Sequence, residues 1–296
     1  MVNETIGIIG LGRMGSAMAG RLAEKGFEVS GWSRRPPDPQ TLSRSGITIA
    51  PDMETLVDAS HILILALLDD AAVHSVLDSL LGLSLQGRLI IDTSTVSPEL
   101  LRGRVSEFEA LGASLMDSPI SGGPEMVLAG KVGLYIGGGQ TDFERFRPIA
   151  ECLSDRIHHV GGLGDGAAAK LVNNMMLMGL WQSLKEALLL GQKAGLPSSK
   201  ILDILSGTPA ASPALKSRLP VIRGETDVVG FPVSGAIKDA RVVRDLAAKL
   251  GVELPAIGAS LASFEAAEVA GYGQSDLATM VRLVAQSDPR HEEHKE

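Results

Sequence analysis

Two groups of residues in this chain have the types and spacing needed for chemistry on a small charged molecule. The first is the turn Ser121-Gly122-Gly123, which follows a predicted strand. A hydroxyl beside two glycine N–H groups can form a concave anion site sized for a carboxylate. The same tripeptide is also ordinary turn chemistry. Its position after a strand favours the ligand site.

The second group lies at the start of a long helix predicted from Ala167 to about Ala194. Lys170 and Asn174 are four residues apart and share a helix face, with Asn173 beside them. Lys170 falls in the first turn, where the helix dipole disfavours the protonated form of a lysine. A lysine that releases its proton near neutral pH suits a general acid in carbonyl reduction. The alternative is a surface lysine on an amphipathic helix.

A glycine-rich loop near the N-terminus predicts a dinucleotide site. The loop is Gly10-Leu11-Gly12-Arg13-Met14-Gly15, between a predicted strand and a predicted helix, residues 16–25. In this pattern the first glycine makes a tight turn, the second lets the backbone approach a pyrophosphate, and the third allows close helix packing. The N–H groups of the helix start then bind the phosphates. A glycine-rich turn without a ligand is the alternative.

The end of the second predicted strand indicates which dinucleotide binds. NAD-specific sites place Asp or Glu there to accept from the ribose 2′-OH. This chain has Ser33-Arg34-Arg35 instead. Two guanidinium groups and a hydroxyl suit a 2′-phosphate, so the sequence predicts NADP(H). A solvated arginine pair before Pro36 is the alternative, although it does not explain the missing acid.

Two further strand ends are expected to reach the cofactor, because ligands of open α/β sheets lie at the carboxyl ends of the strands. Leu67 and Leu68 follow one predicted strand, and Thr95 lies in the segment after the next. Ser97 and Pro98 have the character of a helix N-cap and first helical residue. Thr95 is therefore the preferred ligand contact in that segment.

These motifs are positioned by two predicted domains. Short apolar strands alternate with helical patterns through residues 1–162, which predicts an α/β domain with a doubly wound parallel sheet. After the glycine-rich loop 161–166 only helical patterns occur, so residues 163–290 are predicted to form an all-α domain, with a polar tail at 291–296. The predicted strands are Ile6–Ile9, Glu28–Trp32, Ile47–Ile49, His61–Ala66, Arg88–Ile91, Ser114–Met116 and Leu134–Ile136. The later predicted helices are Ser198–Leu205, Ala214–Val221, Ile237–Leu250, Pro255–Ala270 and Asp276–Ala285.

Composition excludes several classes of function. A net charge of −8 without a basic tract argues against nucleic acid as a partner. The apolar runs are too short to span a bilayer, and the N-terminus has no signal-peptide pattern. The single cysteine, Cys152, fits a reducing compartment, so we expect a cytoplasmic protein. His158-His159, His291 and His294 lack the clustered partners of a metal site, and no metal is predicted.

Taken together, the glycine loop, Ser121-Gly122-Gly123, Lys170 with Asn174, and Phe231-Pro232 before Lys238-Asp239 resemble the β-hydroxyacid dehydrogenase family. That family includes 3-hydroxyisobutyrate dehydrogenases and glyoxylate/succinic semialdehyde reductases. The resemblance runs from Ile6 to about Ala285. It implies an N-terminal Rossmann domain, a long interdomain helix and an all-α domain that forms a homodimer.

By the same resemblance, Lys170 is the catalytic acid/base of a reaction between a small semialdehyde or 2-oxo acid and its hydroxy acid. Ser121, Gly122, Gly123 and Asn174 would hold the substrate carboxylate. Thr95 and Lys238 would contact the cofactor, and Asp239 would orient or neutralise Lys238.

The chain also departs from the family pattern. Met126-Val127 replaces the usual Gly-Ala pair after Ser-Gly-Gly, while Gly235 and Ala240 replace leucines near the Lys-Asp pair. These changes favour a substrate other than the smallest semialdehydes. Imine reductases share the fold and NADPH but generally lack the lysine, so an imine substrate is the alternative. A catalytically idle NADP(H)-binding protein is a third possibility, which Lys170 and Asn174 argue against.

Overall fold

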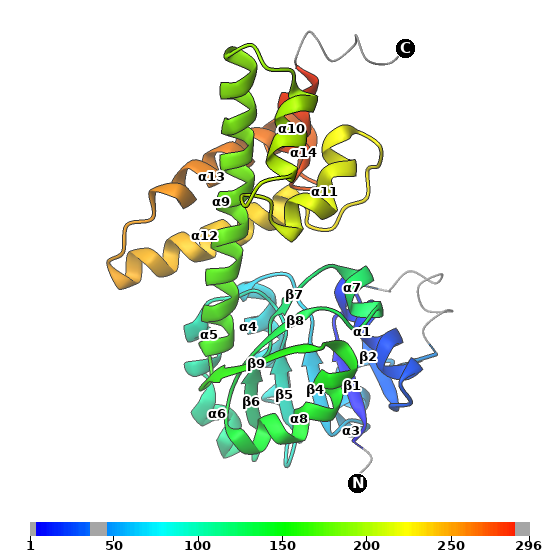
Figure 1. The fold of residues 1–296 in the computed structure, drawn as a ribbon. Coiled ribbons are helices and arrows are strands. Elements are labelled where there is room, and N and C mark those ends of the chain that lie inside the picture. Colours follow the sequence, from blue (N-terminus) through cyan, green and yellow to red (C-terminus); the bar gives the residue numbers. More distant parts are fainter. Residues whose placement is uncertain (1–3, 36–45, 288–296) are drawn as a thin grey trace. The chain divides into compact units, whose positions relative to one another are not determined.

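The computed structural model describes residues 4–35 and 46–287. The chain divides into two compact units, Met1–Leu171 and Val172–Glu296. The first unit is a sheet flanked by helices and the second is helical (Figure 1). One long helix, α9 (Asp165–Lys193), begins in the first unit and continues into the second.

The described part of the first unit contains one sheet of nine strands, in the order β3-β2-β1-β4-β5-β6-β8-β7, with β9 paired to β8. Strands β1 to β6 pair in parallel, whereas β8 is antiparallel to β6 and β7. The bounds are β1 Ile6–Ile9, β2 Val29–Trp32, β3 Thr48–Ile49, β4 Ile62–Leu65, β5 Leu89–Asp92, β6 Ser114–Asp117, β7 Ile120–Ser121, β8 Gly133–Gly137 and β9 Arg156–Gly161.

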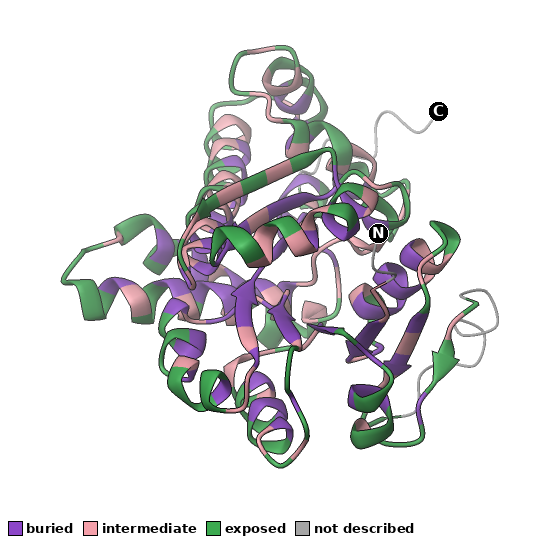
Figure 2. Cartoon of the chain, turned by 90° about the horizontal axis from the view of Figure 1, so that it is seen from below, coloured by how far each residue is buried: buried purple, intermediate pink, exposed green. Residues whose placement is uncertain are grey.

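The central strands β1, β4 and β5 are buried along their whole length, as helices on both faces of a parallel sheet require (Figure 2). Alternate residues of these strands enter two separate cores. Ile8 packs in one core with residues of α1 (Arg13–Glu24), α7 (Pro124–Leu128) and α8 (Gln140–Leu153). Ile9 packs in the other with α3 (Met53–Asp58), α4 (Asp70–Leu80), α5 (Pro98–Arg102) and α6 (Val105–Ala110).

The α/β fold class is confirmed, and each predicted strand is present with bounds within one residue of those expected. The doubly wound sheet is mixed, because β8 runs antiparallel to β6 and β7. Two strands were not predicted. β7 has only two residues, and β9 carries the polar run Arg156-Ile157-His158-His159 at the sheet edge, so neither has the apolar pattern of a buried strand.

The described part of the second unit is helical, as predicted. After α9 come α10 (Ser198–Ser206), α11 (Pro213–Arg223), α12 (Val233–Leu250), α13 (Pro255–Ala267), a π-helical turn (Glu268–Tyr272) and α14 (Thr279–Gln286). Gly224 and Gly251 end α11 and α12 in the left-handed conformation, which glycine adopts without strain. The helix expected to reach Ala270 ends at Ala267, where the π turn begins. The predicted tail, with His291 and His294, lies outside the described residues.

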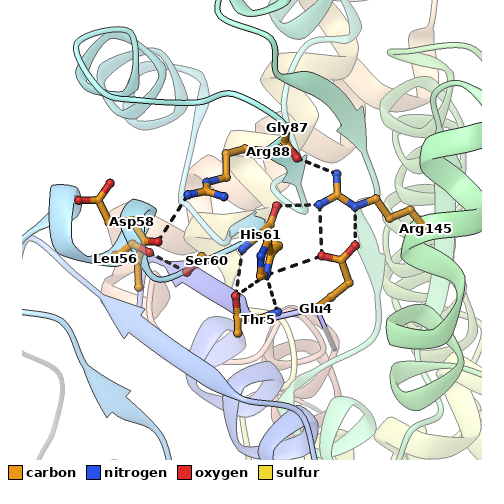
Figure 3. Close-up of polar contacts among 9 residues, drawn as sticks. All are labelled: Glu4, Thr5, Leu56, Asp58, Ser60, His61, Gly87, Arg88 and Arg145. Carbon is orange, nitrogen blue, oxygen red and sulfur yellow. Dashed lines mark hydrogen bonds and ion pairs between the residues drawn. The ribbon is translucent and has the colours of Figure 1, made fainter. Parts of the chain in front are cut away.

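A charged network ties α8 to the amino ends of the strands, opposite the edge that carries the motifs (Figure 3). The Arg145 guanidinium donates to both carboxylate oxygens of Glu4, at 2.7 and 3.2 Å, and to the carbonyl oxygens of Gly87 and His61. Thr5 and His61 exchange further hydrogen bonds between the starts of β1 and β4. One arginine therefore joins residues at the starts of β1, β4 and β5.

We expect Arg145→Ala to lower the free energy of unfolding by about 2–3 kcal/mol, because it removes the guanidinium partner of a half-buried Glu4 carboxylate and the hydrogen bonds to the carbonyls of Gly87 and His61. Arg147→Ala on the same helix is the control. Arg147 pairs with Glu144 at the surface, and both side chains are exposed, so its loss should cost less than about 1 kcal/mol. Urea unfolding of both variants measures the difference. Equal losses would contradict the structural role of Arg145.

Candidate functional site

The glycine loop between β1 and α1 has the geometry of a dinucleotide cradle. Gly10 has φ +103°, and a Cβ there would collide with the carbonyl oxygen of Ala66. A Cβ on Gly15 would collide with the carbonyl oxygen of Gly10. A Cβ on Gly12, by contrast, would meet no atom within 4 Å. The chain itself therefore requires glycine at the first and third positions, whereas at Gly12 it leaves open space of the kind a ligand would fill.

The start of α1 is also electrostatically suited to an anion. Gly12 is its N-cap, no side chain caps the helix, and its first turn contains no acidic residue. Free N–H groups and the helix dipole at such a start favour phosphate. Leu11 is buried and packs where a Cβ on Gly31 of β2 would lie, while Arg13 is exposed and Met14 half-buried. These observations fit the pyrophosphate of a nicotinamide dinucleotide.

The residues predicted to select the dinucleotide lie at the end of β2. Ser33 is half-buried, and Arg34 and Arg35 are exposed. The next residues, 36–45, lie outside the part of the chain that the structure describes. No carboxylate occurs among these three positions, so no negative charge there opposes a 2′-phosphate.

The ends of β4 and β5 are joined by hydrogen bonds. The backbone N–H of Leu67 donates to Ser94 Oγ at 3.0 Å, and the Thr93 hydroxyl donates to the carbonyl oxygen of Leu65 at 2.6 Å. Ser94 is buried, whereas Thr95 is half-buried and Leu68 is exposed. Ser94 therefore fastens the two strand ends together, and Leu68 and Thr95 have accessible side chains at the carboxyl edge of the sheet.

The turn Ser121-Gly122-Gly123 begins at the last residue of β7 and ends at Gly123, the N-cap of α7. Gly122 has φ +145°, a conformation that L side chains rarely adopt. A Cβ on Gly122 would lie 3.1 Å from both Met126 Sδ and Val132 Cγ1. Met126, which replaces a small residue of the family pattern, therefore packs directly over the turn.

Helix α9 begins at Asp165, two residues before the predicted start, so Lys170 is its sixth residue and lies in the second turn and not in the first as predicted. Lys170 is only 8% exposed. A surface lysine, the alternative to a functional one, would not be buried in this way. The helix start is held by Asp117, at the end of β6. Asp117 Oδ1 accepts from the backbone N–H of Gly164 and Oδ2 accepts from that of Ala167, both at 2.6 Å.

Asp117 is 2% exposed, and its pKa is raised from 3.8 to about 6. Burial is the main cause, since a low-dielectric environment disfavours the ionised form. The hydrogen bonds from Gly164 and Ala167 lower the pKa in part, and the nearby charge of Asp92, its partner in the β5–β6 register, raises it. A carboxylate whose ionised form is disfavoured by burial thus lies beneath the first turn of α9.

In the second unit, the structure brings three of the predicted residues together. Asn174 is buried, and its Nδ2 donates to Asp239 Oδ2 at 2.6 Å. Lys238 Nζ lies 2.7 Å from Asp239 Oδ1. The Asp239 carboxylate therefore bridges an amide on α9 and an ammonium on α12, which fixes both side chains.

Asp92 and Asp117 were not predicted as functional residues. The available signal was a carboxylate directly after an apolar run, in Leu-Ile-Ile-Asp and Ser-Leu-Met-Asp. Both carboxylates lie at the strand edge that carries the motifs, where buried polar groups mark functional sites.

Over the ranges 4–35 and 46–287, no group of three or more His, Cys, Asp or Glu residues is placed to hold a metal ion. Within the same described residues, no helix combines the length and apolarity required to cross a membrane.

Comparison with known proteins places the chain in a family. Residues 5–161 match the family model of the NAD binding domain of 6-phosphogluconate dehydrogenase. Residues 164–284 match the model described as NAD-binding of NADP-dependent 3-hydroxyisobutyrate dehydrogenase. The chain belongs to the β-hydroxyacid dehydrogenase family of nicotinamide-dependent oxidoreductases.

Individual relatives match over nearly their full lengths. Glyoxylate/succinic semialdehyde reductase 1 of Arabidopsis thaliana is 28% identical, over 94% of this chain and 98% of the relative. The 2-hydroxy-3-oxopropionate reductase of Escherichia coli is 29% identical, over 94% and 96%. The solved structure of 3-hydroxyisobutyrate dehydrogenase from Mycobacterium tuberculosis with L-serine superposes with a TM-score of 0.85 at 26% identity, over 95% of this chain and 99% of that one. An imine reductase from Pseudomonas sp. shares the fold, with a TM-score of 0.64 at 21% identity.

The raised pKa of Asp117 predicts a pH-dependent stability term. Because its folded pKa is about 6 and its ordinary value is 3.8, its contribution to stability is fully present below 3.8 and is lost as the pH rises through 6. Asp117→Asn removes this dependence. We therefore expect the stability of wild type relative to Asp117→Asn to fall by about 3 kcal/mol between about pH 4 and pH 7. Denaturant unfolding at a series of pH values measures this difference, and a difference independent of pH would contradict the assignment.

Proposed function

We propose that the protein is an NADPH-dependent oxidoreductase that interconverts a small semialdehyde or 2-oxo acid and the corresponding hydroxy acid. Lys170 is the general acid and base of this proposal. The observation that carries it is the burial of Lys170 at the start of α9, in the same compact unit as the open cradle at Gly12. A buried lysine and open space beside Gly12 are both features that a bound ligand would explain.

The chain offers a defined set of groups to NADP(H). The backbone of the glycine loop would bind the pyrophosphate, and Ser33, Arg34 and Arg35 would bind the 2′-phosphate. The description of the second matching family model, which names an NADP-dependent enzyme, agrees with this preference. The further proposed contacts are Leu67, Leu68, Thr95 and Lys238, besides Gly10, Leu11, Gly12, Arg13, Met14 and Gly15 in the loop itself.

The bound nicotinamide would supply or accept the hydride. In reduction, Lys170 Nζ donates a proton to the developing alkoxide oxygen, and in oxidation it accepts that proton. Ser121, Gly122, Gly123 and Asn174 are proposed to hold the substrate carboxylate. Asp239 orients Asn174 through their 2.6 Å hydrogen bond and balances the charge of Lys238.

The residue over the Ser-Gly-Gly turn bears on the substrate. Met126 packs against Gly122 with its sulfur 3.1 Å from the position of a glycine Cβ, and it is 37% exposed. A flexible thioether there fills space that a small residue would leave open. This supports a substrate other than the smallest semialdehydes.

The proposal includes a homodimer in the cytoplasm. On α9, Val172, Met176 and Leu190 are 66%, 69% and 73% exposed, and their spacing places them near one face of the helix. Exposed apolar side chains along one helix face favour a partner surface. The single cysteine, Cys152, supports a reducing compartment.

Lys170→Ala tests the catalytic assignment. We expect NADPH to bind with unchanged affinity and the turnover number to fall by about 10²- to 10⁴-fold, because the general acid is lost. NADPH oxidation is followed with semialdehydes, glyoxylate and cyclic imines. The reverse reaction, reduction of NADP+, is followed with β-hydroxyacids. Lys193→Ala, at the exposed end of the same helix, is the control and should retain activity. Unchanged turnover in Lys170→Ala would refute its role, and oxidation of NADPH only with imines would make the protein an imine reductase.

The preference for NADPH is tested separately with Arg34→Ala and Arg35→Ala combined. Each charge-assisted contact with a phosphate contributes about 1.5–3 kcal/mol, so the dissociation constant for NADPH should rise by at least about tenfold. That for NADH should change little, since it has no 2′-phosphate. Titration of cofactor fluorescence measures both constants. Parallel weakening of both cofactors would contradict a 2′-phosphate site.

A further inference from the structure

We propose that Asp117 is a positioning residue for Lys170: its carboxylate holds the first turn of α9 and so fixes the backbone from which the lysine projects. This inference rests on the proposed catalytic role of Lys170. The hydrogen bonds of the Asp117 carboxylate go to Gly164 and Ala167, and neither residue is predicted to bind cofactor or substrate.

The contact is a bidentate cap from outside the helix. The two oxygens of Asp117 accept from the N–H groups of Gly164 and Ala167, which lie on either side of the first helical residue, Asp165. Helix starts leave such N–H groups without intrahelical partners, and a side chain of the helix itself usually satisfies them. Here the acceptor comes from β6, so α9 begins at a point fixed by the sheet.

The backbone around this cap is packed too closely to accept a side chain at two glycines. A Cβ on Gly166 would collide with the carbonyl oxygen of Tyr135 and would lie 2.7 Å from Asp117 Oδ2. A Cβ on Gly137 of β8 would lie 2.5 Å from Asp117 Oδ1 and 2.7 Å from the Gly166 nitrogen. Two glycines thus let β8, the start of α9 and the Asp117 carboxylate approach one another closely.

Lys170 lies directly above this turn. It follows Gly166 by four residues and Ala167 by three, and helical side chains lean toward the helix N-terminus onto residues at these spacings. A displacement of the Ala167 turn would therefore displace the lysine side chain. Catalytic groups displaced by about 1 Å can lose about 10²-fold in rate.

The energetics support a functional reason for the carboxylate. Burial raises the pKa of Asp117 to about 6, so the fold is less stable when Asp117 is ionised at neutral pH than when it is protonated. Protonation would turn one carboxylate oxygen into a hydroxyl, which is a weaker acceptor, and so would weaken one of the two caps. The other ionisable groups around the helix start are Asp92 on β5, Arg102 on α5, Tyr135 on β8, and Asp165 and Lys170 on α9, with Arg102 Nη2 2.7 Å from Asp165 Oδ1.

The test compares Asp117→Asn with Asp165→Asn. Both variants remove a carboxylate at the start of α9, but Asp165 is solvent-accessible and paired with Arg102. Hydrogen exchange of the backbone from residue 164 to 171 measures the anchoring without reference to activity. Steady-state kinetics then give kcat, KM and their pH dependence with the most active carbonyl substrate of the panel.

For Asp117→Asn we expect faster exchange in this segment, a fall in kcat of about 100-fold and a KM for NADPH within about twofold of wild type. The acid limb of the wild-type kcat profile, centred near the pKa of Asp117 at about 6, should disappear in the variant. Asp165→Asn should retain the limb and lose at most about threefold in kcat. The wild-type chain supplies a measurement that needs no variant, since the protection factors of this segment, which are the intrinsic exchange rates at each pH divided by the observed rates, should fall as the pH falls through about 6.

Unchanged exchange in Asp117→Asn, or wild-type protection factors that do not change between about pH 5 and pH 7, would overturn the inference. Faster exchange with an unchanged kcat would overturn it as well, since the anchor would then not position the lysine. A wild-type protein without activity on any carbonyl substrate would instead refute the proposed function, and the exchange measurement would still decide whether Asp117 anchors the helix.

Discussion

The structure depends on close approach of backbone to backbone at the carboxyl edge of the sheet. The first turn packs there because Gly10 and Gly15 have no Cβ, and the start of α9 packs there because Gly137 and Gly166 have none. Each contact brings a helix N-terminus against a strand end. Because both faces of a parallel sheet are covered by helices, its ligands bind at this edge, beyond the carboxyl ends of the strands. The glycines that allow the close packing therefore lie where the candidate site is.

Much of this arrangement could be predicted from local sequence. The apolar runs predicted the central strands β1, β4 and β5 within one residue because a strand buried on both faces requires a continuous apolar segment. The helices of the second unit followed from apolar periodicity and glycine stops. β9 was not predicted because Arg156, His158 and His159 interrupt any continuous apolar run, and β7 was not predicted because two residues carry no periodicity.

The candidate site was predicted unevenly for a related reason. A motif such as the glycine loop is contiguous, so its spacing is visible in the sequence. The contact of Asp117 with Gly164 and Ala167 joins positions 47 and 50 residues apart, and only the folded backbone reveals it. The link between Asn174 and Asp239 spans 65 residues, and the sequence did not predict it. Contacts of charged side chains with residues far away in the sequence are therefore the part of the site that only the structure reveals.

The central claim is that the loop after β1 is built to bind a dinucleotide, and Gly12 tests it most directly. A methyl group at Gly12 meets no atom of the chain, whereas one at Gly15 collides with backbone. Gly12→Ala should therefore unfold within about 1 kcal/mol of wild type while its dissociation constant for NADPH rises by about 100-fold, equivalent to about 2.7 kcal/mol. Gly15→Ala should instead lose stability. A Gly12→Ala protein that binds NADPH as tightly as wild type would contradict the account.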